Sequence, residues 1–220
     1  MISKLPSWVW PATWLLAFVA GMINVVGLLG FERQAVTHLS GITTMVGAAI
    51  AQGSGASLRH YLALLGSFIA GTIISALIIQ DSTLRIGRRY GAALLLESVI
   101  LVAAVPLLTA GHHLGMCLAS CACGLQNAMA TTYSGAVVRT THVSGMLTDL
   151  GIALGHWLRG IPVDARRLRL CIIVTTAFLT GAAAGALGFQ HLAYATLYIP
   201  ASLTVLCALA YEVLIRRSRP

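Results

Sequence analysis

Two stretches of the chain are copies of one another: THLSGITTMVGAAIAQ at residues 37–52 and THVSGMLTDLGIALGH at residues 141–156. At an offset of 104 residues, seven of 16 positions are identical: Thr37/Thr141, His38/His142, Ser40/Ser144, Gly41/Gly145, Thr44/Thr148, Gly47/Gly151 and Ala49/Ala153. The flanks match as well. Gly21-x-x-Asn24 and Gly124-x-x-Asn127 precede the two copies, and FIAGTIISALI (68–78) and FLTGAAAGALG (178–188) follow them. We therefore predict an internal duplication, with repeats at 1–110 and 111–220.

The composition around these copies is that of a protein buried in lipid. Of the 220 residues, 58% are hydrophobic and 9% are charged, against roughly a quarter charged in a soluble domain. Such a chain cannot cover a water-facing surface, which excludes a soluble enzyme, a disordered protein and a nucleic-acid-binding module. The net charge of +8 lies in short loops between apolar runs, which is typical of topology signals. The lipid bilayer is the predicted partner.

Six apolar runs are long enough to cross the membrane, and two are shorter. The long runs lie at about 8–29, 61–79, 90–109, 114–131, 170–187 and 193–214, and each suits ~30 Å of hydrocarbon at about 1.5 Å per residue. The first run is too long for a cleaved signal peptide. The short runs, 38–52 and 142–157, contain the repeated motif and would reach only about 22–24 Å as helices.

The basic residues favour six crossings over eight. With six crossings and the N-terminus inside, 12 Lys and Arg residues are cytoplasmic and two, Arg33 and Arg59, lie outside. With eight crossings the split falls to 9 against 5, a poorer fit to the positive-inside rule. We predict an all-α polytopic protein with six transmembrane helices, two short re-entrant or half-span helices and both termini in the cytoplasm. Three crossings per half make a 3+3 inverted repeat, which many secondary transporters share.

Several stretches resemble the YoaK-like family of bacterial multi-pass membrane proteins. They are GMINVVGLLGF (21–31), THLSG (37–41), GLQNA (124–128) and VRTTHVSGMLTDLG (138–151), and the resemblance runs from about residue 12 to 214. It implies a multi-pass protein of the bacterial inner membrane and a presumption of transport. This chain has Asn24 where the family usually has Asp, and Ile42 where it usually has Asn. If those positions touch a solute, this member differs in selectivity or coupling.

Two acids in or near the membrane are candidate functional groups. Glu97 lies eight residues beyond Arg89, about 12 Å deep in a helix. An ionised carboxylate there is expensive, so the group is either protonated or paired. It serves either as a proton-coupling carboxyl or, when protonated, as a structural hydrogen-bond donor. Asp149 follows the second motif. It either faces a central cavity or pairs with Arg139 or Arg159.

The polar residues of the repeat are candidate substrate ligands. A short helix that begins at Thr-His-x-Ser-Gly would present free N–H groups to an anionic group, and Thr or Ser is a good N-cap. The candidates are His38, Ser40 and Gly41 with His142, Ser144 and Gly145, joined by the amides of Asn24 and Asn127. A structural cap and interhelical hydrogen bonds are the alternative reading. We expect Gly151-x3-Gly155 and Gly181-x3-Gly185 to pack helices closely inside the chain.

These features predict a small secondary transporter for a small polar solute, an anionic one included, with a site near the midplane. No phosphate loop, catalytic motif or zinc spacing occurs, and His112 and His113 are expected to form a solvated turn, so we expect no cofactor and no metal. The alternatives are a non-transporting assembly or sensor module and an intramembrane enzyme that uses His142 and Asp149. A transporter should have a polar cavity lined by both halves. A homodimer is compatible with the sequence.

Overall fold

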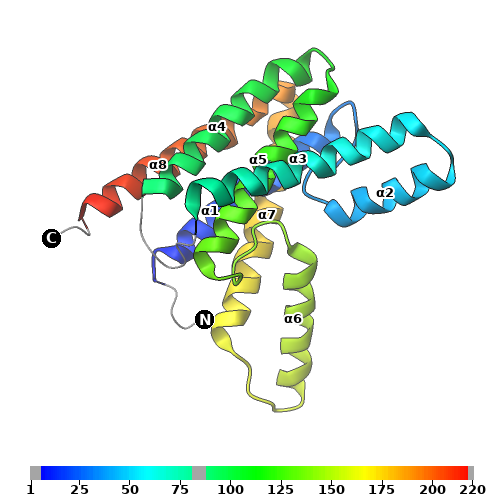
Figure 1. Cartoon of the computed structure of the whole chain (residues 1–220). Helices are drawn as coiled ribbons and strands as arrows, with labels where there is room; N and C mark the ends of the chain where they lie inside the picture. The colour runs from blue at the N-terminus through cyan, green and yellow to red at the C-terminus, as the bar shows by residue number, and fades with distance from the viewer. Residues whose placement is uncertain (1–5, 81–87, 218–220) are drawn as a thin grey trace.

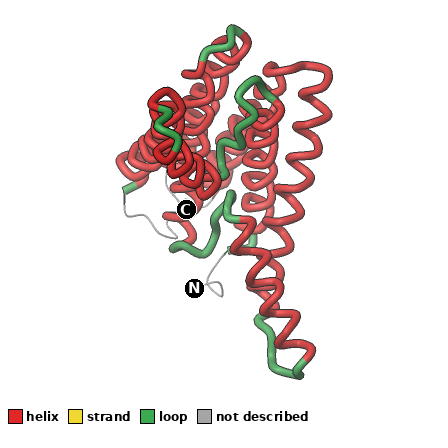
Figure 2. Tube along the Cα trace, turned by 90° about the vertical axis from the view of Figure 1, so that its right-hand side faces the viewer, coloured by secondary structure: helices red, strands yellow, loops and turns green. Residues whose placement is uncertain are grey.

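A computed structural model of the protein describes residues 6–80 and 88–217. These residues form α1 (Val9–Leu29), α2 (Leu39–Ala51), α3 (Gly55–Ile79), α4 (Arg88–Thr109), α5 (His113–Ser134), α6 (Val143–Leu158), α7 (Ala165–Leu192), the 3-10 helix η2 (Ala193–Leu197) and α8 (Tyr198–Arg217). Figure 2 shows helices joined by short loops, with no strand in the described part. The all-α prediction is confirmed, and both short runs are helices. Lys4, Arg85 and Arg219, predicted to be cytoplasmic, lie outside the described residues.

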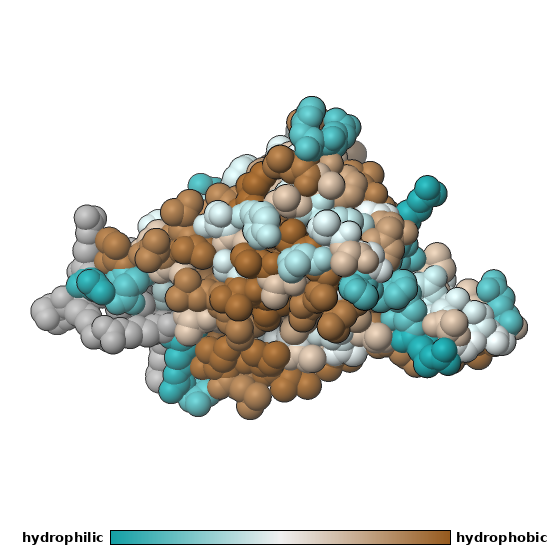
Figure 3. All heavy atoms as spheres, turned by 90° about the horizontal axis from the view of Figure 1, so that it is seen from above, coloured by the Kyte–Doolittle hydropathy of each residue, from teal (hydrophilic) through white to brown (hydrophobic). Residues whose placement is uncertain are grey.

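Four helical segments are long and apolar enough to cross a membrane: Val9–Leu29, Gly55–Ile79, Arg89–Thr109 and Ala165–Val213. The last contains 49 residues and covers both α7 and α8. Large apolar side chains face outward, and Ile69, Ile73 and Leu77 make an exposed row on α3. Figure 3 shows hydrophobic residues over much of the visible face, with hydrophilic ones gathered toward its edges. The molecule is therefore built as a helical membrane protein.

Helix α5 is not among these apolar segments because most of it faces protein. It packs between α3 and α4, and its buried positions include Gly115, Ser120, Gly124 and Gln126. Small and polar residues suit a helix that contacts other helices rather than lipid. A criterion based on hydropathy alone therefore does not select α5, although the helix is 22 residues long.

Two predicted runs differ from the helices in ways that local chemistry explains. The run at 170–187 becomes α7, which starts at Ala165 because the side chain of Asp164 caps the backbone N–H groups of Arg166 and Arg167. Asp at this position satisfies orphan donors of the first turn. The run at 193–214 is split into η2 and α8. Pro200 lies in the first turn of α8, where its missing N–H costs no helix bond.

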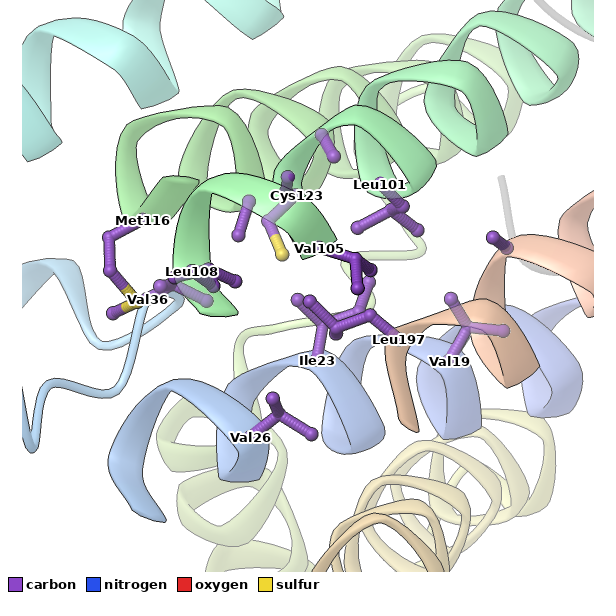
Figure 4. Packing of buried hydrophobic residues seen from close by; sticks show 14 of the residues in the cluster. Val19, Ile23, Val26, Val36, Leu101, Val105, Leu108, Met116, Cys123 and Leu197 are labelled. Atoms are coloured by element: carbon purple, nitrogen blue, oxygen red, sulfur yellow. The ribbon is translucent and has the colours of Figure 1, made fainter. Parts of the chain in front are cut away.

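The helices pack in pairs, α1 against α7 and α3 against α5, with α4 between α5 and α8. Figure 1 shows α2 beside α3 and α6 beside α7 as two hairpins that project from the bundle in different directions. The central core joins α1, α4, α5 and η2. Figure 4 shows this cluster, in which Ile23, Val105 and Leu197 point toward one another.

Two glycines bring α1 and α7 into backbone contact. A Cβ atom at Gly21 would stand 2.2 Å from the carbonyl oxygen of Phe178, and one at Gly181 would stand 2.0 Å from that of Phe18. No real Cβ tolerates such a distance, so only glycine allows these helices to approach this closely.

The α3–α5 pair uses the same device. A Cβ atom at Gly124 would stand 2.1 Å from the carbonyl oxygen of Phe68, and one at Gly71 would stand 2.0 Å from that of Cys121. Gly124 and Cys121 follow Gly21 and Phe18 by 103 residues, while Gly71 and Phe68 precede Gly181 and Phe178 by 110. Equivalent positions of the two sequence copies therefore make both contacts.

Of the two small-residue patterns that we expected to pack inside the chain, only one does so. A Cβ at Gly185 would press on the backbone of Met22 in α1, so Gly181-x3-Gly185 does pack inside the chain. Nothing lies within 4 Å of the place a Cβ would take at Gly151 or Gly155. The prediction of internal packing is wrong for this second pair, because α6 turns these glycines away from α7.

Candidate functional site

A cavity of about 510 Å³ lies between the two halves of the chain. Its walls come from the first half through α1 and α4 and from the second half through α5, α8 and the loop at Val138. The lining is mostly apolar, with side chains such as Leu94, Met129 and Leu206. A cavity lined by both halves was expected for a transporter, but a polar lining was also expected and is not observed here.

One lining residue supplies an unused polar group. The hydroxyl oxygen of Tyr133 is buried and has no hydrogen-bond partner among the described residues. Ser134, also on the wall, already accepts the N–H of Val138 at 2.8 Å. A buried hydroxyl without a partner is unfavourable, so a bound molecule with a hydrogen-bonding group would satisfy Tyr133.

Four of the residues that line the cavity are aromatic and lie together. The rings form a closed chain of contacts, with centroids 5.1 Å apart for Trp8–Tyr133, 5.3 Å for Tyr90–Tyr133, 6.0 Å for Tyr90–Tyr211 and 5.8 Å for Trp8–Tyr211. These spacings are those of favourable aromatic pairs. We call this set the aromatic cluster. It gathers the starts of α1 and α4 and the ends of α5 and α8 in one place.

Glu97 lies behind the cavity wall on α4. Its side chain is fully buried, and neither carboxyl oxygen has a hydrogen-bond partner among the described residues. Leu94, one turn away, and Cys207, within electrostatic reach of the carboxyl group, both line the cavity. An unpaired ionised carboxylate is too costly in such surroundings, so we expect the group to carry a proton. A structural hydrogen bond, which was the alternative to proton coupling for Glu97, is not formed with any residue that the structure describes.

The two amides of the repeat lie in different environments. The Oδ1 atom of Asn24 accepts from the backbone N–H and the hydroxyl of Thr37, at 3.0 and 2.7 Å, and so ties α1 to the start of α2. The Oδ1 atom of Asn127 is buried without a partner in the described residues. In the second half Gln126 makes the link instead. Its amide donates to the carbonyl oxygen of Leu16 at 2.7 Å and to the Thr140 hydroxyl at 3.3 Å.

His38 and His142 adopt the same local structure. Each is the N-cap residue of its short helix, and neither side chain makes a capping hydrogen bond. The prediction that Thr or Ser would cap these helices is therefore wrong. Each imidazole instead folds over the glycine three residues on, at 2.0 and 2.1 Å from the place a Cβ would take at Gly41 and Gly145. The glycine of the motif thus makes room for the histidine ring.

The remaining motif residues lie on exposed surface or in an ion pair. Ser40 and Ser144 are exposed. Asp149 pairs with Arg167 of α7, which donates from Nε at 3.2 Å and from Nη2 at 2.8 Å. We had considered Arg139 or Arg159 as partners for Asp149. Because Arg167 starts the helix on which α6 packs, it lies closer.

The structure does not bring the predicted substrate ligands together. Within the described residues α2 packs on α3 alone and α6 on α7 alone, so His38 and His142 lie on separate hairpins (Figure 1). None of the residues predicted from the repeat lines the cavity in the described part. Sequence reasoning missed the cavity wall, because its apolar residues look like any other lipid-spanning sequence.

A second contact of distant segments lies beyond the other end of α1. Glu32 meets His60 of α3 and His113 of α5, with carboxyl-to-imidazole distances of 3.2 and 2.5 Å. Trp8 precedes α1 and Glu32 follows it, so this contact and the aromatic cluster mark opposite ends of the same helix.

The apolar helices and their glycine-mediated packing define a helical membrane protein. Comparison with known families then identifies the chain. Residues 12–210 match the family described as a protein of unknown function (DUF1275), and the chain belongs to that family. This is consistent with the YoaK-like resemblance of its motifs. No match was found among curated proteins or among solved structures.

Proposed function

We propose that the protein is a small proton-coupled secondary transporter in a bacterial inner membrane. The observation that carries the proposal is the cavity between the two halves with the buried, unpaired carboxyl group of Glu97 behind its wall. Intramembrane acids without partners are rare outside solute and proton pathways. Rocking one repeat against the other would expose the cavity to each side in turn.

The two end contacts support six crossings. With six crossings and a cytoplasmic N-terminus, all four residues of the aromatic cluster lie on the cytoplasmic side, and Glu32, His60 and His113 all lie outside. With eight crossings, Tyr90 and Tyr133 would face the opposite side from Trp8 and Tyr211. Residues in ring contact cannot lie on opposite sides of about 30 Å of hydrocarbon. The contacts therefore favour six spans with α2 and α6 as half-span helices.

The glycine contacts support an inverted duplication. Helix α1 of the first half packs on α7 of the second, and α5 of the second packs on α3 of the first, through equivalent glycines. Two copies that exchange equivalent contacts are related by an approximate two-fold axis. With three crossings per half, such an axis lies in the membrane plane.

Cysteine labelling tests this topology. Ala56 lies in the first turn of α3 and Ile161 lies just after α6, and both are exposed. In a cysteine-free background and sealed vesicles of known orientation, we expect Ala56→Cys to react with an impermeant maleimide from the outside alone, and Ile161→Cys from the cytoplasmic side alone. Reaction of both from the cytoplasmic side would instead indicate eight crossings and parallel repeats.

The lining of the cavity favours a different kind of solute from the one that the sequence motifs suggested. Sequence motifs suggested a polar molecule, an anionic one included. The mostly apolar walls and the unpartnered hydroxyl of Tyr133 instead favour a small molecule with an apolar body and one hydrogen-bonding group. An ionised solute would lose its hydration there without compensation. We therefore propose a small, mostly apolar solute that is carried in its neutral form.

Alternating access can be tested without knowing the solute. Cys207 lines the cavity, whereas Cys171 is buried elsewhere. We expect a variant that keeps Cys207 as its single cysteine to react with a small impermeant maleimide from either face of sealed vesicles. The matched variant that keeps Cys171 should react from neither. Labelling of Cys207 from one face only, or from none, would favour the alternative of a non-transporting assembly or sensor module.

A further inference from the structure

Three side chains with metal-ligating atoms converge where α1, α3 and α5 meet. They are Glu32 in the α1–α2 loop, His60 near the start of α3 and His113 at the start of α5, and one ligand atom from each lies within 4.8 Å of the others. The Nδ1 atom of His113 lies 2.5 Å from one carboxyl oxygen of Glu32, and the Nε2 atom of His60 lies 3.2 Å from the other.

The carboxyl group of Glu32 is unusually placed for a simple surface ion pair. Its side chain is only 3% exposed. The imidazole of His60 is close to Oε2 of Glu32, but it is not oriented to form a hydrogen bond. Oε2 therefore has no hydrogen-bond partner among the described residues. A buried carboxylate oxygen without a partner costs free energy. A cation between the carboxylate and the imidazoles would remove that cost.

Two imidazoles and one carboxylate form a ligand set that first-row divalent metals prefer. Zn²⁺ binds histidine nitrogen and carboxylate oxygen at about 2.0–2.2 Å, so two ligands of one tetrahedral ion lie roughly 3.3 Å apart. The His60–Glu32 distance of 3.2 Å fits this spacing, and the shorter His113 contact needs a small outward shift. Because 71% of the His113 side chain is exposed, its side of the site is open to water or another ligand.

The loop that carries Glu32 is held in place. The backbone N–H of Phe31 donates to the Tyr194 hydroxyl at 2.7 Å, and the Phe31 ring lies against both Tyr194 and His113. The rings of His60 and His113 are also in contact, with centroids 5.1 Å apart. Such contacts outside the ligands fix their orientation, which strengthens metal sites.

We propose that Glu32, His60 and His113 bind one divalent transition-metal ion of the Zn²⁺ class. The ion joins the α1–α2 loop and α3 of the first half to α5 of the second. The ligands come from three separate segments, 28 and 53 residues apart, which explains why no metal spacing is visible in the sequence.

Metal binding can be measured on the full chain in detergent, independently of transport. We expect protein stripped with a chelator and dialysed against ZnCl₂ to retain one zinc per chain by elemental analysis. Its melting temperature should rise with zinc concentration, because the ion binds the folded state. Co²⁺ should give visible absorption bands that Zn²⁺ abolishes.

A substitution of His113, the most exposed of the three ligands, is the most direct test of the site. We expect His113→Ala to weaken zinc affinity at least about 100-fold, more than changes outside the ligand set usually do, without changing the melting temperature of the stripped protein. The neighbouring His112→Ala, also exposed, is the matched control and should bind like the wild type. Equal binding by His113→Ala, equal loss by His112→Ala, or no retained zinc in the wild type would each overturn the proposal. None of these results would support or contradict the transport proposal, which does not depend on metal binding.

Discussion

Replacing Glu97 by glutamine should abolish proton coupling while leaving the protein as stable as before or more stable. The carboxyl group is fully buried without a hydrogen-bond partner in the described residues, so the fold gains little from it. Glutamine keeps its shape but cannot release a proton. The apolar Glu97→Met should be stabilising by about 1–3 kcal/mol, because it removes an unsatisfied buried polar group.

The experiment combines stability with proton movement. Wild-type protein and both variants are reconstituted in vesicles with an internal pH dye, and a panel of small, weakly polar solutes is added under a pH gradient. Solute-dependent acidification should occur with the wild type and with neither Glu97 variant, while melting temperatures in detergent rank these three proteins. Glu212→Gln, which removes a half-exposed carboxyl group paired with Arg216, is the control and should behave like the wild type. A large loss of stability in Glu97→Gln would show that Glu97 is structural.

A single methyl group at Gly71 should destabilise the protein far more than one at Gly66 of the same helix. The Cβ of Gly71→Ala would meet the carbonyl oxygen of Cys121 at 2.0 Å, whereas nothing lies within 4 Å at Gly66. Overpacking of this kind costs about 1–3 kcal/mol or more, because the two helices must move apart. Gly66→Ala should stabilise α3 by about 0.5–1 kcal/mol.

The equivalent glycine of the other helix pair extends this test. Gly181→Ala would place its Cβ 2.0 Å from the carbonyl oxygen of Phe18, so its effect should match that of Gly71→Ala. Thermal unfolding in detergent, followed by circular dichroism, measures all three variants. If Gly71→Ala and Gly66→Ala were equally stable, the close approach of α3 and α5 would be wrong. Unequal effects at Gly71 and Gly181 would argue against equivalent packing in the two halves.

Much of the fold could be predicted from the sequence because lipid imposes simple rules. Apolar runs of sufficient length become helices, since every backbone group must be satisfied internally, and both short runs did so as α2 and α6. Helix ends were less predictable. Arg166 and Arg167 lie outside the apolar run in the sequence, but they do not lie outside the helix. The helix includes them because Asp164 caps its first turn ahead of them.

The candidate sites were much less predictable. The repeat drew attention to His38 and His142, whose rings turned out to lie over their own glycines. By contrast, the ordinary-looking residues Tyr133 and Cys207 line the cavity. Repetition in a sequence marks what both copies need for folding, while a site formed once between the copies leaves no repeated signal.

The sequence by itself determined an all-helical membrane protein, two related copies of one motif, and a buried acid at position 97. These features follow from local composition and periodicity, which do not depend on how the segments are arranged in the tertiary structure. The tertiary structure alone decided which helices touch, that a cavity lies between the halves, and that Glu32, His60 and His113 meet. Those outcomes depend on close approach at a few glycines, and proximity between distant segments has no signature along the chain.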